Sequence, residues 1–369
     1  MSTAWWVLLG SLAFVGFTYV GYPAICLLRG RLFARPIARD PAYRPRVSIL
    51  IAAFREAKTI ERKLASLAEQ SYPAEHVEVI VACDGSDDGT PEIARAAGEK
   101  YLRGRCQVLA LPVRKGKPPA LNAAAQAAGG EGLLLTDARQ PLSPNAVQML
   151  VEDLGDETVG AVGGELVMGG DAPAGAYWKY EAAIRKLEGA SGSTVGVSGA
   201  LYAVKRALWQ PMPDETILDD VLQPMRVRLA KKRVAFEPRA QAFDTAAESK
   251  REFQRKVRTL SGNFQLLLLA PALLSPLHNP SWFDFVSHKL CRLFVPYALV
   301  AALVAAFFLP APWLFILGGG QAAGYSLAAL RAVGLELPLS GLAETFVVLN
   351  AAAVVGLLRF LRHGRNLPW

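Results

Sequence analysis

The N-terminal segment constrains the fold of this chain more than any other feature. Residues 5–28 contain no charged side chain and are long enough to cross the hydrocarbon core of a bilayer as one helix. Trp5 and Trp6 suit a membrane–water interface, and the run lacks the basic start and small-residue cleavage site of a signal peptide. We therefore expect residues 1–28 to form a retained transmembrane helix.

The C-terminal third contains three more apolar runs, at about 291–309, 312–330 and 342–358. Three glycines at 318–320 weaken the second run, and Glu344 and Asn350 weaken the third. A buried helical core would give a similar pattern. The runs predict transmembrane helices within residues 288–362, followed by a tail at 363–369.

Basic residues predict which side of the membrane the middle of the chain occupies. Six arginines follow the first span, in a linker at 29–45 and the residue after it, against Asp40 alone: Arg29, Arg31, Arg35, Arg39, Arg44 and Arg46. The positive-inside rule places this linker and the residues after it in the cytoplasm. Three further crossings would put the tail outside, whereas Arg359, Arg362 and Arg365 favour the inside. Either one C-terminal run does not cross, or residues 263–275 re-enter the membrane.

The charge and the cysteines argue against several other classes of function. The formal net charge is +8, but the arginine cluster beside the first span suits anionic lipid headgroups better than nucleic acid. The four cysteines are scattered, with no spacing typical of a metal site. We therefore expect contacts with membrane lipids and none with nucleic acid.

Strands and helices alternate in the middle of the chain. Residues 46–54, 76–84, 106–111 and 132–137 are apolar runs typical of buried strands, and helical patterns separate them. The alternation predicts an α/β fold, a mostly parallel sheet with helices on both faces. Further on we expect a strand at 161–168, a helix at 174–191, a strand leading into a helix at 197–209, a helix at 218–232 and a strand pair at 233–244. The basic, amphipathic composition that follows predicts interfacial helices within 246–287.

Acidic residues at strand ends mark a candidate ligand site. Asp84 ends one apolar run, before the turn-rich GSDDGT, and Asp137 ends another. Because open α/β sheets bind ligands outside the carboxyl ends of their strands, these carboxylates belong where a nucleotide would lie. An ordinary Asp- and Gly-rich turn is the alternative for Asp84. Arg139 follows Asp137 by two residues, where it could contact phosphate or pair with Asp137.

Asp219 and Asp220 stand at the start of the helix predicted at 218–232. A helix N-terminus favours negative charge, so helix capping is one explanation for the pair. The other makes one of them the base that takes a proton from an acceptor hydroxyl. Two adjacent acids would allow one to cap the helix while the other acts in catalysis.

Basic and aromatic residues supply candidate contacts for phosphates and sugars. Lys115 and Lys117 lie on a Gly/Pro loop before a helix, where phosphate contact and plain solvation are both open. Three residues near the basic stretch could meet a diphosphate or lipid headgroups: Arg255, Lys256 and Arg258. Three aromatic residues could stack on sugar rings or pack in a core or interface: Tyr177, Trp178 and Tyr180.

Seven segments, in order, resemble glycosyltransferase family 2, in particular its membrane-embedded bacterial polysaccharide synthases. They are VSILIAAFREA, VIVACDGSDDGT, GKPPALN, LLLTDARQ, VSGALYAVKR, LDDVLQPMR and QRKVRT, and they cover about residues 46–260. The segment YWKYEAAIRKLEG followed by VSGALY is similar to the branch containing hyaluronan and poly-N-acetylglucosamine synthases. The cellulose synthases are further members that the chain resembles.

The resemblance implies a glycosyltransferase-A fold over residues 46–245 and an inverting transfer from a nucleoside-diphosphate sugar, with UDP as the expected nucleotide. The expected donor contacts are Ala53, Glu56, Asp84, Lys117, Asp137, Arg139, Arg255 and Arg258. On the acceptor side we expect Ser198 and Gly199, with Tyr177 and Trp178 as candidate stacking residues. Asp220 would be the general base, with Asp219 as its neighbour.

Two departures from the family pattern concern the donor site. The D-x-D pattern is Asp137-Ala138-Arg139 here, so the second acid that normally meets Mg²⁺ or Mn²⁺ is missing and Asp137 alone remains. The Q-x-x-R-W pattern is Arg255-Lys256-Val257-Arg258-Thr259 here, so the Gln and the Trp are both missing. The loss of these two residues argues against processive polymerisation. We hypothesise that Arg139, together with Arg255, supplies part of the positive charge usually given by the metal ion.

These inferences predict a multi-pass protein of the bacterial inner membrane with its catalytic domain in the cytoplasm. It would extend a polysaccharide, with product translocation and export partners as further expectations. Transfer of a single sugar to a lipid-linked acceptor is the alternative within this class. Outside it, the alternative is a non-catalytic sugar-nucleotide-binding subunit of an export complex, which would bind nucleotide without transferring sugar.

Overall fold

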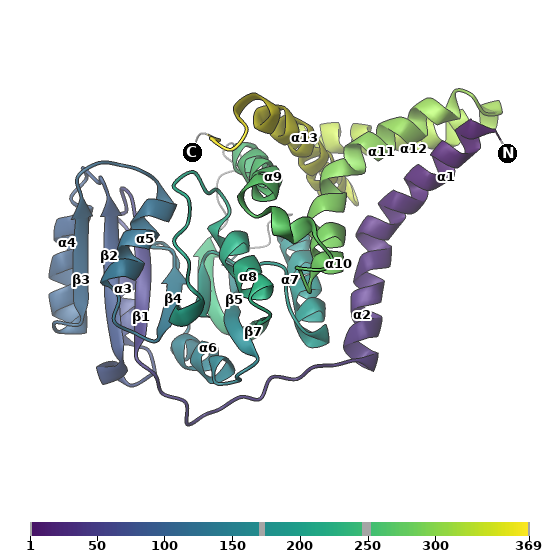
Figure 1. Ribbon diagram of the computed structural model, residues 1–369. Coiled ribbons are helices and arrows are strands. Elements are labelled where there is room, and N and C mark those ends of the chain that lie inside the picture. Colours follow the sequence, from purple (N-terminus) through teal and green to yellow (C-terminus); the bar gives the residue numbers. More distant parts are fainter. Residues whose placement is uncertain (1, 170–173, 246–251, 368–369) are drawn as a thin grey trace.

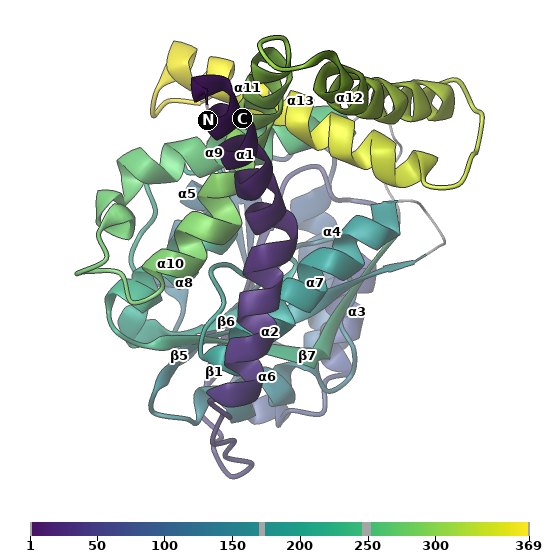
Figure 2. The ribbon, with the colours of Figure 1, turned by 90° about the vertical axis from the view of Figure 1, so that its right-hand side faces the viewer.

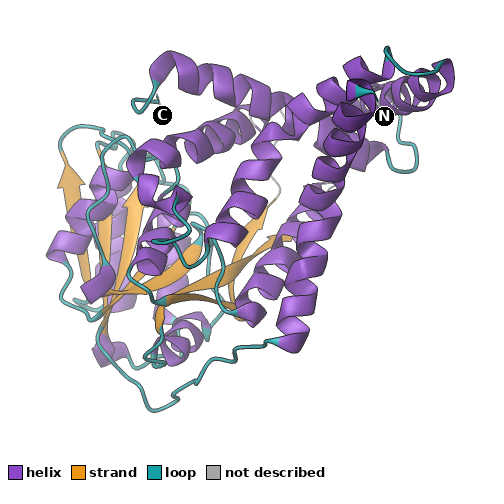
Figure 3. Ribbon diagram, turned by 45° about the vertical axis from the view of Figure 1, so that its right-hand side comes forward, coloured by secondary structure: helices purple, strands orange, loops and turns teal. Residues whose placement is uncertain are grey.

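The computed structural model describes residues 2–169, 174–245 and 252–367 of the 369-residue chain. A sheet with helices on both faces forms one part of the molecule, and a long N-terminal helix runs beside it (Figures 1 and 3). The C-terminal helices gather at one end, next to the start of that N-terminal helix (Figures 1 and 2). The structure therefore joins an α/β domain to a group of long apolar helices.

Seven strands form one sheet, in the order β3-β2-β1-β4-β6-β5-β7. The strands are β1 (Val47–Ala53), β2 (Val77–Asp84), β3 (Cys106–Leu111), β4 (Gly132–Thr136), β5 (Val159–Gly169), β6 (Leu201–Lys205) and β7 (Arg233–Thr245). Strand β6 runs antiparallel to both of its neighbours, and the remaining pairings are parallel. The predicted mostly parallel α/β sheet is confirmed.

Two hydrophobic cores lie on opposite faces of this sheet, because successive strand residues point to opposite sides. Ile49 and Ile51 of β1 pack in the first core and Leu50 packs in the second. The first core includes residues of α3 (Ile60–Ala68), α4 (Thr90–Ala97) and α6 (Ala146–Leu154). The second includes residues of α5 (Lys117–Ala127), α8 (Asp219–Leu229) and α9 (Glu252–Leu269). Helices α5 and α8 thus both pack on the second face.

The strand pair predicted at 233–244 is wrong, because these residues form the single strand β7. Both halves of β7 pair with β5, and the register breaks between the pairs Gly164–Glu237 and Glu165–Gln241. The break spans Pro238, which has no backbone N–H to donate to the ladder. Strand β7 therefore bulges at the break and continues to pair with β5 beyond it. The helix expected after β6 is reduced to the short 3₁₀ turn Arg206–Leu208.

In the part of the chain that the structure describes, four helices are long and apolar enough to cross a membrane: Thr3–Leu32, Trp282–Ala306, Ala311–Ala332 and Ser340–His363. The first joins α1 (Thr3–Gly16) to α2 (Tyr22–Leu32) through a π-helical turn. The second joins α10 (Trp282–Phe285), the π-helical turn η7 (Val286–Leu290) and α11 (Cys291–Ala306). The last two are α12 (Ala311–Ala332) and α13 (Ser340–His363), so all four predicted apolar runs form helices.

The residues after α13 return to the α/β domain. Arg365 forms an ion pair with Glu215, on the loop before α8, and its backbone oxygen accepts a 2.7 Å hydrogen bond from Gln265 of α9. Residues 263–269 belong to α9, where Phe264 and Leu266 pack in the second core. The expectation that residues 263–275 re-enter the membrane therefore has no support, and the tail lies on the side of the α/β domain.

Candidate active site

Asp84 anchors a loop at the end of β2. Its side chain is 3% exposed, and its two carboxylate oxygens accept hydrogen bonds from the backbone N–H groups of Lys115 (2.8 Å) and Gly116 (2.7 Å). Gly85 has φ +62°, and a Cβ there would lie 2.4 Å from the backbone nitrogen of Arg114. Asp84 therefore fixes the loop that leads into Lys117, a role beyond that of a plain turn residue.

Lys117 is the centre of the site. It is the first residue of α5, and its Nζ lies 2.9 Å from Oδ1 of Asp137 and 3.2 Å from Oδ2 of Asp219. A Cβ at Gly199 would lie 3.3 Å from the same Nζ and 3.6 Å from Oδ2 of Asp220. One ammonium group thus meets carboxylates delivered by the end of β4 and by the start of α8.

Asp220 has the electrostatic environment of a base that titrates near neutrality. Burial, together with the neighbouring Asp219, raises its pKa to about 6 against the opposing effect of Lys117. Neither Asp219 nor Asp220 caps α8, because the N-cap position is Leu218 and no side-chain cap bond is made there. The capping alternative therefore does not account for the pair, although both carboxylates still lie in the first turn of the helix.

Arg139 does not pair with Asp137. Its guanidinium is 52% exposed and its Nε lies 3.9 Å from Oε1 of Glu56, whereas Lys117 is the cation beside Asp137. Glu56 follows β1, where its backbone N–H donates to Oγ1 of Thr90 at 2.9 Å. The sequence hypothesis placed the compensating charge on Arg139, and the structure places a second and closer cation, Lys117, against Asp137.

The other predicted residues differ in how close they come to this centre. Ala53 is buried at the end of β1, and Ser198 is buried beside Gly199, just before β6. Arg258 of α9 is half-buried; burial lowers the pKa of its guanidinium while Asp219 and Asp220 oppose that effect. Arg255 is exposed on the same helix. The side chains of Tyr177 and Trp178 lie outside the described residues.

Two residues of the site were missed at the sequence level. Tyr202 of β6 is fully buried, and among the described residues its hydroxyl has no hydrogen-bond partner. Burial, Asp219 and Asp220 raise its pKa. Lys63 of α3 is also fully buried, and its Nζ donates to Oγ1 of Thr136 (2.7 Å) and to the backbone oxygen of Gln140 (2.6 Å). Lys63 therefore ties together both ends of the segment that carries Asp137.

Comparison with known proteins matches part of the chain to one enzyme family. The family model described as glycosyl transferase family 2 matches residues 48–209, which include Asp84, Lys117 and Asp137. Residues 48–209 are therefore similar to family 2 glycosyltransferases. The sheet and its covering helices form the glycosyltransferase-A fold. Asp219 and Asp220 lie just beyond the matched range.

The chain matches only part of the length of its curated relatives. A probable glycosyltransferase of Bacillus subtilis, YdaM, is 35% identical over 33% of this chain and 29% of its own. The poly-β-1,6-N-acetyl-D-glucosamine synthase of Staphylococcus epidermidis is 24% identical over 60% of this chain and 55% of its own. The chain thus spans about half or less of these relatives.

One solved structure is similar over nearly the whole chain. It is the mannosyltransferase PcManGT from Pyrobaculum calidifontis, in complex with GDP-Man and Mn²⁺. It has a TM-score of 0.78 and 25% identity, and the match covers 96% of this chain and 99% of that one. Because both chains are covered almost completely, the likeness extends beyond the catalytic domain to the apolar helices.

The described side chains offer little to hold a divalent metal ion by themselves. Among the described residues there is no group of three or more His, Cys, Asp or Glu side chains that could hold one. Near Asp137 the D-x-D partner is an arginine, and the Lys117 ammonium already contacts the carboxylate. A metal ion here would have Asp137 as its protein ligand and would depend on phosphate oxygens of the donor, a mode common for Mg²⁺.

Proposed function

We propose that the protein is an inverting membrane glycosyltransferase that uses a nucleoside-diphosphate sugar as donor. The observation that carries this proposal is that Asp220, a carboxylate with a pKa raised to about 6, lies near the Lys117 ammonium that pairs with Asp137 and Asp219. The arrangement combines a base for the acceptor with a cation for the leaving group, as displacement at an anomeric carbon requires.

In the proposed reaction, Asp220 takes the proton of an acceptor hydroxyl, and the oxygen attacks the anomeric carbon of the donor sugar. The bond from that carbon to the diphosphate breaks, and its electron pair leaves with the diphosphate. Lys117 and Arg258 stabilise the departing charge, with Arg139 at the exposed rim of the same site. Attack opposite to the leaving group inverts the anomeric configuration.

In this proposal the donor binds at the carboxyl ends of β1, β2 and β4. We propose that Ala53, Glu56 and the loop held by Asp84 border the nucleoside, as expected from the sequence. UDP is the expected nucleotide, and the solved mannosyltransferase with GDP-Man makes GDP the second nucleotide to test. The acceptor would enter past Ser198 and Gly199, because a Cβ at Gly199 would lie close to both Lys117 and Asp220.

The proposed location is a bacterial inner membrane, with the α/β domain in the cytoplasm beside the arginine-rich linker. The tail contacts Glu215 of that domain, so we propose that one of the three C-terminal helices does not cross completely. Protease protection of tags placed at residue 1 and after residue 369, in sealed inverted vesicles, tests this topology. We expect protection of the first tag and cleavage of the second.

The experiment that tests the function offers the purified protein a panel of UDP- and GDP-linked sugars with a membrane extract as acceptor. We expect release of one nucleoside diphosphate with formation of a glycosylated product. Sizing this product separates polysaccharide extension, the first candidate, from addition of a single sugar to a lipid-linked acceptor. Nucleotide binding without release or transfer would support the non-catalytic alternative instead.

A further inference from the structure

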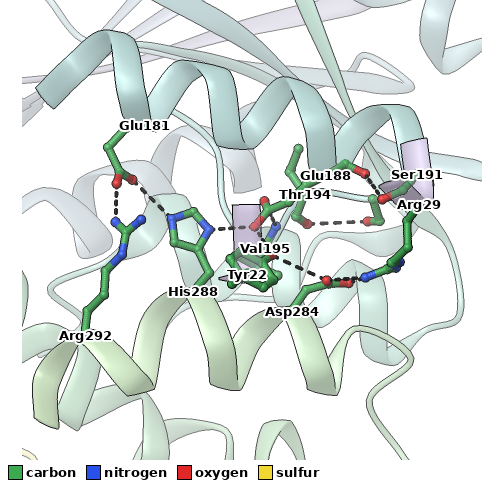
Figure 4. A network of polar contacts seen from close by, with 11 residues as sticks. Tyr22, Arg29, Glu181, Glu188, Ser191, Thr194, Val195, Asp284, His288 and Arg292 are labelled. Atoms are coloured by element: carbon green, nitrogen blue, oxygen red, sulfur yellow. Dashed lines mark hydrogen bonds and ion pairs between the residues drawn. The ribbon is translucent and has the colours of Figure 1, made fainter. Parts of the chain in front are cut away.

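A buried polar cluster joins the catalytic domain to two of the apolar helices (Figure 4). At its centre, His288 of η7 lies between two acids of α7 (Ala174–Ser191): its Nδ1 is 2.6 Å from Glu188 and its Nε2 is 3.2 Å from Glu181. Tyr22 of α2 donates a 2.5 Å hydrogen bond to Glu188. Arg292 of α11 forms an ion pair with Glu181. The cluster thus links α2, α7 and the second apolar helix.

A second ion pair extends this cluster. Arg29 at the end of α2 donates to Asp284 of α10 at 2.6 Å, and Asp284 also accepts a 3.4 Å hydrogen bond from Tyr22. Glu188 and His288 are each 1% exposed and Asp284 is 6% exposed. Buried charges of this kind hold a fixed geometry only when their partners are all in place. The cluster therefore fixes turn η7 against the catalytic domain.

Lys289 follows His288 on that turn and lies on the side of the candidate base. A Cβ placed at Gly196 would lie 3.7 Å from Cε of Lys289 and 3.7 Å from the backbone oxygen of Asp220. The charge of Lys289 acts on Asp220 and lowers the pKa of that carboxyl. A cation carried by the second apolar helix thus lies near the backbone of the residue that we propose as the base, and its charge acts on that residue's carboxylate.

The Lys289 ammonium has no hydrogen bond or ion pair with the residues that the structure describes. The nearby acids are occupied, because Glu181 contacts His288 and Arg292 and Glu188 contacts His288 and Tyr22. A half-buried cation without a partner is costly unless a ligand supplies negative charge. This position therefore suits an anionic group that arrives with a substrate.

We propose that Lys289 binds the phosphate of a lipid-linked acceptor and so places its hydroxyl beside Asp220. The inference rests on the proposed function and deepens it by naming the acceptor class. Two cations of the catalytic domain, Lys117 and Arg258, already serve the donor side. Lys289 instead comes from a helix apolar enough to lie in a membrane, where a lipid phosphate would also lie. A neutral polysaccharide would leave this cation unmatched.

The test compares binding of two amphiphiles that differ only in their headgroup, dodecyl phosphate and dodecanol. Titration calorimetry with the full chain in neutral detergent micelles measures both, and UDP and GDP are titrated separately. The variants are Lys289→Met and Lys289→Arg, with Lys100→Met as a control that removes a surface lysine paired with Glu61. Thermal unfolding verifies that each variant is folded.

We expect the wild type, Lys289→Arg and Lys100→Met to bind dodecyl phosphate about tenfold more tightly than dodecanol, a difference typical of one charge-assisted contact. Lys289→Met should lose this preference and bind the better nucleotide unchanged. A preference that persists in Lys289→Met would overturn the proposal. The proposal would also be overturned if Lys289→Met bound nucleotide more weakly and kept its preference for dodecyl phosphate, because Lys289 would then belong to the site of the donor diphosphate. This binding experiment does not require turnover. It can therefore be interpreted even if the protein shows no activity with the panel of sugar nucleotides.

Discussion

Replacing Lys117 with methionine tests the electrostatic coupling between the Lys117 ammonium and the Asp220 carboxylate. The ammonium lies 2.9 Å from Asp137 and 3.2 Å from Asp219, and it lowers the pKa of Asp220. Methionine keeps most of the side-chain volume but removes the positive charge. Burial and Asp219 would then act on Asp220 without this opposing cation, so its pKa should rise above the present value of about 6.

The size of the effect follows from the distance between the two charges. Nζ of Lys117 and Oδ2 of Asp220 lie within 3.3 Å and 3.6 Å of one point beside Gly199, so they are at most about 7 Å apart. At that distance and an effective dielectric constant of about 20, their attraction is about 2.4 kcal/mol. This corresponds to a rise of about 1.7 in the pKa of Asp220.

The assay is the pH dependence of kcat/KM for nucleoside-diphosphate release, between about pH 5 and pH 9. A base must be deprotonated to act, so activity should rise with pH through the pKa of Asp220. We expect a midpoint near pH 6 for the wild type and for Lys117→Arg, and a midpoint between about pH 7 and pH 8 for Lys117→Met. A midpoint that stays near pH 6 in Lys117→Met would refute the proposed coupling.

Three further predictions concern the metal, a buried lysine and the polar cluster. The wild type should retain activity after chelation, whereas Arg139→Asp, which restores D-x-D, should become strictly dependent on Mg²⁺ or Mn²⁺. The prediction is contradicted if chelation abolishes wild-type activity, Mg²⁺ or Mn²⁺ restores it fully, and Arg139→Ala has no effect. Burial lowers the pKa of Lys63 to about 7. Between about pH 7 and pH 10 the lysine is therefore protonated in the unfolded chain and neutral in the folded one. Its contribution to the free energy of unfolding should rise by about 1.4 kcal/mol per pH unit over this range. The Tm difference between wild type and Lys63→Met should track that slope, and a constant difference would contradict it. Glu188→Ala should cost about 3–5 kcal/mol, because it leaves His288 beside one acid only; a Tm equal to that of a surface control, Glu75→Ala, would disprove this.

The sequence predicted the parts of the fold that depend on local pattern. Strand β3 has the bounds expected from CQVLAL, and the helix expected at 174–191 is α7. The positions of Asp84, Asp137 and Asp220 at strand or helix ends followed from where the apolar runs stop and start. Strand β7 differed because its two halves share the neighbour β5, and partner choice is not encoded in the local alternation of residues.

The contacts within the site depended on long-range placement and could not be predicted in the same way. Lys117 meets Asp219 only because α5 and α8 lie on the same face of the sheet, although a hundred residues separate them in sequence. Lys289 reaches the neighbourhood of Asp220 from an apolar helix. Lysines in loops and helices have no periodic signal that distinguishes a site residue from a solvated one. The sequence therefore indicated the acids and left their cationic partners open.

The most direct test of the central claim is the rate of sugar transfer by Asp220→Asn, measured with the donor that the sugar-nucleotide panel identifies. The control is Asp214→Asn, which changes an exposed carboxylate on the loop before α8. Loss of a general base typically costs 10²–10⁴-fold in rate. We predict a loss of about 10³-fold for Asp220→Asn, with nucleotide binding kept and the control fully active. Transfer by Asp220→Asn within about tenfold of the wild type would contradict the role of Asp220 as the base.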